Sequence, residues 1–296
     1  MEADDNYEVI PTLKIQDVIN CKVSNWYELF KDHCLKLDII KLNKAFIDYL
    51  KADGIILPNE CINDEDKEEE EEYVGFPHLS NEINNTIKKF KKVIPKINLT
   101  TPIDVKWIKF DHSIECDNID DIYLLLKASD FIIGEITGQP FENCIDFDAY
   151  SENEMEYELV LKEFKNFNKS QEFRLFIRDH TLIGISQRDL NFYEHFQSFE
   201  FKSNLKNRIS EFFNVIVKNK FYNSNYILDI IIDERNEIYI IDFNVYDTRT
   251  DSKLFGYEEL LHDFKSNNLQ VKVIDVDDSN NINNLYSTSS LQKEFL

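Results

Sequence analysis

The sequence predicts an α+β fold with a largely antiparallel sheet. Residues 172–178 alternate polar and apolar side chains, and 182–188 follow a short turn, so the two segments form a hairpin. A second hairpin is expected from 226–232 and 237–244, which flank a polar turn. An amphipathic helix at 203–219 connects the hairpins. The order hairpin, helix, hairpin favours antiparallel strands over parallel ones.

The remaining elements are read from the same periodicities. Apolar residues recur every three or four positions over 24–52 and 80–92, which predicts helices. A proline interrupts the apolar run 93–98, so a short extended segment is expected there. A further helix should follow Asp120-Asp121, and 158–161 should form a short buried strand.

Three regions are expected along the 296 residues, of which 43% are hydrophobic. Residues 1–72 form an N-terminal helical segment that ends in an acidic loop, Asp-Glu-Asp-Lys-Glu-Glu-Glu-Glu-Glu at 64–72. Residues 73–262 form the main α+β domain, and 263–296 form a polar C-terminal tail rich in Asn and Ser. From about 266 this tail is expected to be mostly disordered or wrapped along the surface.

The charge restricts the possible partners. The chain has 33 Lys and Arg against 56 Asp and Glu, a net charge of −23. Such a field repels nucleic acid and anionic membranes, so neither is expected as a partner. It suits docking on a basic protein surface, and an anionic ligand would need local cations.

Cysteine usage and hydropathy point to the cytoplasm. The five cysteines have no metal-binding spacing and suggest no disulfide framework, so free thiols in a reducing compartment are expected. The N-terminus resembles no signal peptide, and no apolar run approaches the ~20 residues of a membrane span.

The second hairpin carries the acidic residues of a candidate metal site. Asp242 and Asn244 are two apart on a strand, so both face the same side, while Phe243 faces the core. Asp229 lies within an apolar strand, where a carboxylate is costly unless it is paired or metal-bound. If the hairpin register is symmetric, Asp229 falls near Asp242, and two carboxylates with one amide oxygen suit Mg²⁺. Alternatively, Asp242 and Asn244 merely end a strand and begin a turn.

Basic residues supply the other half of the candidate site. Arg174 and Arg188 lie on polar faces of the first hairpin, Lys162 ends another strand, and Lys96 follows the proline of 93–98. Guanidinium groups suit phosphate oxygens. Each of these cations could instead be a solvated surface residue. No glycine-rich P-loop or Rossmann fingerprint is present.

At these residues the chain resembles the cell division cycle protein 123 family, whose fold is ATP-grasp-like. The matching stretches cover roughly 74–262 in family order: FPHL at 76–79, PKIN at 95–98, TPIDVKWI at 101–108, DIYLLLKASDFI at 121–132, LVLKEF at 159–164, EFRLFIR at 172–178, LIGISQRD at 182–189, LDI at 228–230, IDFNVY at 241–246 and TDSKLFGYEEL at 250–260.

The resemblance implies that ATP and Mg²⁺ bind between two lobes. Asp229, Asp242 and Asn244 fall on the metal-contacting positions of the family. The full set of cofactor-binding residues implied by the resemblance is Lys96, Lys162, Glu163, Phe164, Glu172, Arg174, Ser186, Arg188, Asp189, Asp229, Asp242 and Asn244. Residues 162–164 match the adenine-side hinge, and Lys96, Arg174 and Arg188 match phosphate-side basic residues.

The resemblance also implies the function of an assembly chaperone. The family binds the gamma subunit of eukaryotic translation initiation factor 2 and promotes joining of the alpha subunit. A monomer without proven catalytic activity is expected. Two alternatives stay open: an ATP-grasp ligase or kinase with an unidentified acceptor, and an interaction protein whose nucleotide site has decayed.

Three departures from the family pattern bear on these alternatives. The hinge usually reads Arg-Lys-Trp and here is Lys162-Glu163-Phe164, which loses an arginine fork and a large ring and adds an acid. The family's LNWSAP reads INLTTP at 97–102, and Asn-Val-Tyr at 244–246 replaces Asn-Pro-Phe. The expected metal-contacting residues are intact.

Overall fold

The computed structural model describes residues 8–58, 75–150 and 155–275. The chain divides into two compact units. The first consists of Met1–Cys34, Asn143–Phe147 and Asn166–Phe295, and the second of Leu35–Glu142, Asp148–Lys165 and Leu296. Each unit contains one of the two sheets.

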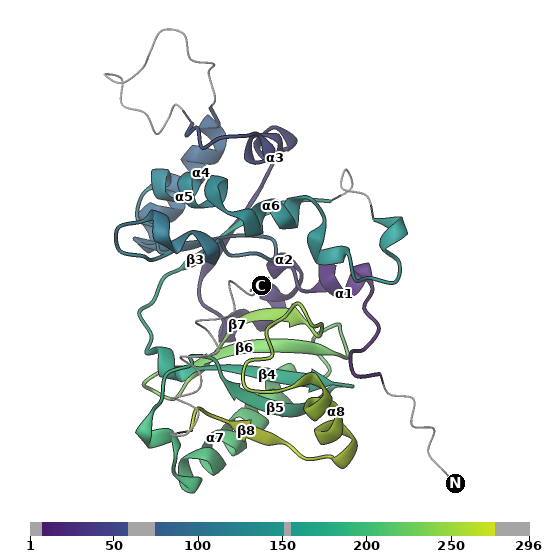
Figure 1. Cartoon of the computed structure of the whole chain (residues 1–296). Helices are drawn as coiled ribbons and strands as arrows, with labels where there is room; N and C mark the ends of the chain where they lie inside the picture. The colour runs from purple at the N-terminus through teal and green to yellow at the C-terminus, as the bar shows by residue number, and fades with distance from the viewer. Residues whose placement is uncertain (1–7, 59–74, 151–154, 276–296) are drawn as a thin grey trace. The chain divides into compact units, whose positions relative to one another are not determined.

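A five-stranded sheet forms the centre of the first unit, with the order β7-β6-β4-β5-β8 (Figure 1). Its strands are β4 (Glu172–Arg178), β5 (Thr181–Gln187), β6 (Tyr226–Ile232), β7 (Ile238–Val245) and β8 (Gln270–Lys272). All neighbours are antiparallel except β5 and β8, which are parallel. Both expected hairpins, β4-β5 and β6-β7, are confirmed.

Helices pack on both faces of this sheet. They are α1 (Ile15–Asn20), α2 (Val23–Phe30), α7 (Phe199–Phe212), continued by the π-helix η10 (Phe213–Val217), and α8 (Tyr257–Ser266). On one face, the ring of Phe243 lies 5.0 Å from Trp26, 5.3 Å from Phe30 and 4.0 Å from Phe221. Phe243 therefore faces the core, as expected, and its neighbours Asp242 and Asn244 face the other side.

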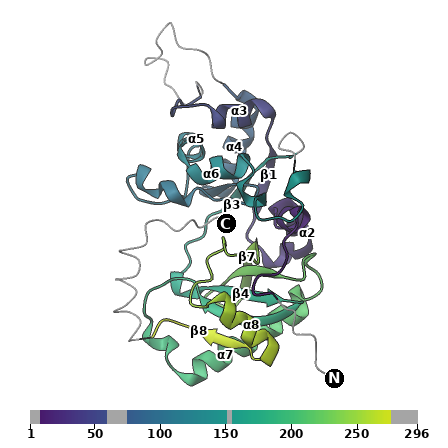
Figure 2. The ribbon, with the colours of Figure 1, turned by 45° about the vertical axis from the view of Figure 1, so that its right-hand side comes forward.

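The second unit contains a three-stranded antiparallel sheet, β1-β3-β2, with helices beside it (Figure 2). Its strands are β1 (Leu37–Lys41), β2 (Val93–Ile97) and β3 (Glu158–Glu163), and its helices are α3 (Lys44–Lys51), α4 (Pro77–Phe90), α5 (Ile119–Ala128) and α6 (Asp130–Ile136). Leu159 and Leu161 of β3 join the apolar core that these helices form. Pro95 lies in β2, an edge strand, where its missing N–H is tolerated.

Two sequence expectations were wrong in part. The segment 24–52 is not continuously helical, because strand β1 (Leu37–Lys41) lies between α2 and α3 and pairs with β3. Its apolar residues at 37, 39 and 40 fit a paired strand as well as a helix. The polar segment after 266 likewise begins with strand β8, which pairs with β5. The acidic loop 64–72, Cys61 and residues 276–296 lie outside the described residues.

Two further features of the described residues concern disulfide bonds and membrane-spanning helices. Within the described residues, Cys21, Cys34, Cys116 and Cys144 form no disulfide. No helix in the described part of the chain is both long and apolar enough to span a bilayer.

Candidate functional site

A line of polar residues crosses one face of the five-stranded sheet. Ser186 of β5 lies opposite Arg174 of β4, Arg174 lies opposite Asp229 of β6, and Asp229 lies opposite Asp242 of β7. Residues that are directly opposite on antiparallel strands point to the same face. The sequence placed these four residues in one site, and the register brings them into one row.

A β-bulge in β7 brings Asp242 into this row. At the turn of the hairpin, Ile232 pairs with Ile238, a register that would place Ile241 opposite Asp229. The register shifts between Asp229 and Ile230, so that Asp229 faces Asp242 instead. Because side chains alternate along a strand, a slip of one residue exchanges the two faces. The bulge therefore turns Asp242 and Asn244 to the same face as Asp229.

The centre of the row is a buried ion pair. Arg174 donates from Nε to Asp229 Oδ1 and from Nη2 to Asp229 Oδ2, each at 2.8 Å. The side chains are only 1% and 3% exposed. Burial alone would raise the pKa of Asp229, but Arg174 and Arg188 outweigh it and hold this pKa below its ordinary value. Asp229 is therefore an anion at neutral pH and fixes the Arg174 guanidinium.

A second arginine extends the cationic side of the site. Arg188 donates from Nη1 to Glu172 Oε2 at 2.8 Å, and its Nε lies 3.4 Å from Asp229 Oδ2. Its side chain is 28% exposed, in contrast to the buried Arg174. Ser186, next to this pair, accepts a hydrogen bond from the Leu254 N–H and donates to the Gln187 carbonyl. The predicted residues of the first hairpin thus lie together.

Asn244 presents an oxygen suited to a cation. Its Nδ2 donates to Asp229 Oδ2 at 3.3 Å, which fixes the amide orientation. Its Oδ1 is buried and has no hydrogen-bond partner among the described residues. A buried acceptor without a donor costs free energy unless a ligand satisfies it. Together with the Asp242 carboxylate, on the same face and 7% exposed, this oxygen fits the donor set that Mg²⁺ prefers.

Asp229 is less available as a metal ligand than Asp242 and Asn244. Both of its oxygens already accept hydrogen bonds from Arg174, although a carboxylate offers about four lone-pair sites. No group of three or more His, Cys, Asp or Glu side chains among the described residues could hold a metal alone. A Mg²⁺ ion here would therefore need ligand phosphates or water in its shell.

Lys253 is a cation near the site that no sequence pattern indicated. Its Nζ lies 2.7 Å from Asp251 Oδ2, and its side chain is 6% exposed. Asp251 also accepts from Arg174 Nη1 through its carbonyl oxygen at 2.5 Å. Lys253 has a φ of 54°, an uncommon conformation for a lysine. The segment TDSKLFGYEEL supported the resemblance, but no periodicity or spacing indicated that this loop contacts Arg174.

Asp189 lies apart from the polar row. It follows β5 and accepts hydrogen bonds from Asn191 Nδ2, at 2.9 Å to Oδ1, and from the Tyr193 hydroxyl. These bonds tie Asp189 into the loop after β5. Its expected contact with the cofactor stays a prediction.

The other four predicted residues belong to the second unit. Lys96 lies opposite Val160, and Lys162 lies opposite Ile94, so both lysines share the face of the three-stranded sheet opposite Leu159 and Leu161. Glu163, at the end of β3, points to the other face, and its N–H donates to the Lys36 carbonyl. Phe164 follows, and its N–H donates to the Lys92 carbonyl at 2.9 Å.

A buried acid accompanies Lys96 in the second unit. Glu135 of α6 accepts from the Leu99 N–H at 3.1 Å and is 2% exposed. Burial raises its pKa to about 7, although Thr100, Leu99 and the charge of Lys96 oppose the shift. No sequence pattern indicated Glu135, because a single acid on an apolar helix gives no signal of its partners.

Comparison with known proteins identifies the family. The D123 family profile matches residues 26–296. This chain belongs to that family. Two curated relatives, from Vanderwaltozyma polyspora and Aspergillus niger, are each 34% identical to it. The alignments cover 84% and 85% of this chain and 75% and 72% of the relatives. Both relatives carry the name "Translation initiation factor eIF2 assembly protein".

The D123 fold is also seen in a solved structure. Cdc123 from Schizosaccharomyces pombe matches with a TM-score of 0.76 and 29% identity, over 89% of this chain and all of that chain. The predicted membership of the cell division cycle protein 123 family is thereby confirmed. So is the predicted α+β fold class with largely antiparallel sheets and N-terminal helices.

Proposed function

We propose that this protein binds ATP with Mg²⁺ and promotes assembly of the eukaryotic translation initiation factor 2 heterotrimer by binding its gamma subunit. The assembly role is supported by the D123 relatives, which carry that factor in their names. A cytoplasmic location accords with this role. Assembly requires binding and release of subunits and no chemical step on them.

The observation that carries nucleotide binding is the oriented oxygen of Asn244 beside the Asp242 carboxylate. Both lie on the face of the sheet that also carries the Arg174 guanidinium, and Asn244 contacts Asp229 of the row. Arg188 and Lys253 add positive charge close to the Asp229 carboxylate. Mg²⁺ would supply the charge that joins acidic side chains to phosphate oxygens. In a chain of net charge −23, such a local set of cations is what an anionic ligand needs.

Calorimetry with ATP and Mg²⁺ tests nucleotide binding. Asp242→Asn and Asn244→Ala should each weaken Mg²⁺-dependent binding by about tenfold or more, because each removes a metal donor. Glu200→Gln, at an exposed position of α7, controls for the lost charge of Asp242→Asn. Failure of wild type to bind at millimolar nucleotide would indicate the decayed site instead.

Reconstitution of the heterotrimer tests the assembly role separately. The purified gamma subunit should be captured by the wild-type chain, and addition of the chain should raise the yield of the alpha-containing complex. Asp242→Asn should lower that yield, while Glu200→Gln should not. An unchanged yield without the chain would reject the assembly role, even if ATP binds.

The ATP-grasp enzyme remains the second candidate function. It is favoured by the same candidate metal ligands and basic side chains, because phosphoryl transfer also requires a positioned metal ion and phosphates. ATP turnover that depends on a defined acid or protein acceptor would support it.

A further inference from the structure

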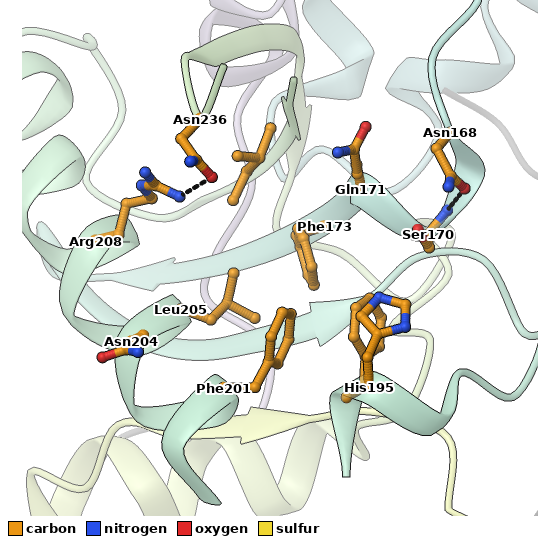
Figure 3. Close-up of a pocket in the computed structure, with 12 residues that line it drawn as sticks. Asn168, Ser170, Gln171, Phe173, His195, Phe201, Asn204, Leu205, Arg208 and Asn236 are labelled. Atoms are coloured by element: carbon orange, nitrogen blue, oxygen red, sulfur yellow. Dashed lines mark hydrogen bonds between the residues drawn. The ribbon is translucent and has the colours of Figure 1, made fainter. Parts of the chain in front are cut away.

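The first unit has a pocket of about 690 Å³ on the face of the sheet opposite the polar row (Figure 3). Phe173 of β4 lines it, and Phe173 pairs with Ile230, whereas the adjacent Arg174 pairs with Asp229. Adjacent residues on a strand face opposite sides. The pocket is therefore separate from the proposed nucleotide site, although the two share β4.

The pocket has an apolar floor. Phe173 and Phe196 are each 2% exposed, and Leu205 and Ile232 are each 6% exposed. The ring of Phe201 stacks on Phe196 at 4.7 Å and completes this aromatic surface. Figure 3 shows Phe173, Phe201 and Leu205 directed toward the centre of the pocket. A large aromatic or aliphatic side chain fits such a floor.

The rim is polar and carries no carboxylate. It contains the amides of Asn168, Gln171, Asn204 and Asn236, together with His195 and Arg208. Side-chain amides can both donate to and accept from a peptide backbone. None of the twelve lining residues is Asp or Glu, in a chain that contains 56 of them. The smaller pockets of about 430 and 250 Å³ both include acids.

Arg208 gives the rim its charge. Its Nη1 donates to Asn236 Oδ1 at 2.6 Å, one bond from a group that has five N–H donors.

We propose that this pocket docks an acidic, apolar segment of a partner protein. A bulky side chain of the segment enters above Phe173 and Phe201, and a neighbouring carboxylate pairs with Arg208. The net negative charge of the chain does not prevent this, because the lining itself contains Arg208 and no carboxylate, and salt screens charges beyond about 8 Å. Charge complementarity at contact range favours an acidic partner over a basic one.

Fluorescence anisotropy with a labelled peptide, Gly-Asp-Leu-Phe-Glu-Gly, tests the proposal on the full chain. The peptide should bind saturably. Arg208→Glu should weaken binding by about tenfold or more, because it replaces a charge-assisted bond by repulsion. Asn204→Trp, which places a large ring at the exposed rim, should also weaken binding. Arg235→Glu is the matched control: it reverses an exposed charge beside Asn236 but does not line the pocket, and should leave affinity within about twofold.

Four outcomes would overturn the proposal. The first is a lack of saturation at millimolar protein, and the second is equal losses for Arg208→Glu and Arg235→Glu, which would show unspecific attraction. Displacement by a synthetic peptide of residues 276–296 would assign the pocket to the chain itself. Equally tight binding of phenylacetate would assign it to a small organic acid. Unchanged circular dichroism and urea unfolding of each variant must accompany a supporting result.

Discussion

Replacing Arg174 by methionine should strongly destabilise the first unit. The substitution removes both 2.8 Å bonds to Asp229 and leaves a carboxylate that is 3% exposed. Breaking a buried ion pair from one side costs about 3–5 kcal/mol. Arg188 and Asn244 remain within 3.4 Å and 3.3 Å of Asp229, so we expect a loss near the lower value, about 3 kcal/mol.

Urea unfolding followed by tryptophan fluorescence measures this loss. The chain has two tryptophans, and Trp26 packs on Phe243 within the first unit. A Trp107→Phe background therefore reports on that unit alone. The double variant Arg174→Met, Asp229→Leu removes both charges. It should recover much of the lost free energy of unfolding, because an apolar pair can replace a buried ion pair without loss of stability. A cost below about 1 kcal/mol for Arg174→Met alone would refute the reasoning.

The pH dependence gives a second check on the same pair. The folded-state pKa of Asp229 lies below its ordinary value of 3.8, so its stabilising contribution is present above about pH 4. That contribution is lost as pH falls through the lowered pKa. Without Arg174 the folded-state pKa of Asp229 should rise. Protonation of Asp229 then removes the free-energy cost of burying an unpaired carboxylate. The stability difference between wild type and Arg174→Met should therefore shrink from pH 7 toward pH 3.

Three further predictions follow from single side chains. Lys253→Met should weaken Mg²⁺-ATP binding by about tenfold in calorimetry, because it removes a cation close to Asp229. Glu135→Gln should flatten the pH profile of urea unfolding between about pH 4.5 and 7, where the raised pKa of Glu135 makes wild type less stable as pH rises. Gly184→Ala should cost about 1–3 kcal/mol in unfolding, since its Cβ would lie 2.9 Å from Leu260 Cδ2.

Much of the site could be predicted because two-residue periodicity determines which side chains share a face. The alternation in 172–178 and 182–188 placed Arg174, Ser186 and Arg188 on one side of a hairpin, and the structure confirms that hairpin. The cost of burying a lone carboxylate pointed to a partner for Asp229. Its partner is Arg174 on the neighbouring strand, a pairing between hairpins that no local pattern specifies.

Elements defined by long-range pairing were harder to predict. Strand β1 has the apolar spacing of a helix as well as of a strand, and only its pairing with β3 decides between them. The same is true of β8, three residues whose place in the sheet depends on β5. The pocket behind the polar row is likewise formed by segments from four parts of the chain, including the loops before β4 and after β6.

The arrangement predicted for the metal site depends on the β-bulge in β7 as well as on the two-residue periodicity of the strands. A regular hairpin that continued the pairing of Ile232 with Ile238 would bring Ile241 opposite Asp229 and turn Asp242 away. The sequence expectation of Asp242 near Asp229 assumed a symmetric register, yet it is the break in symmetry that puts them together. The same extra residue keeps Phe243 against Trp26 on the opposite face. One inserted position thus serves both the core and the candidate metal site, which is typical of bulges beside functional residues.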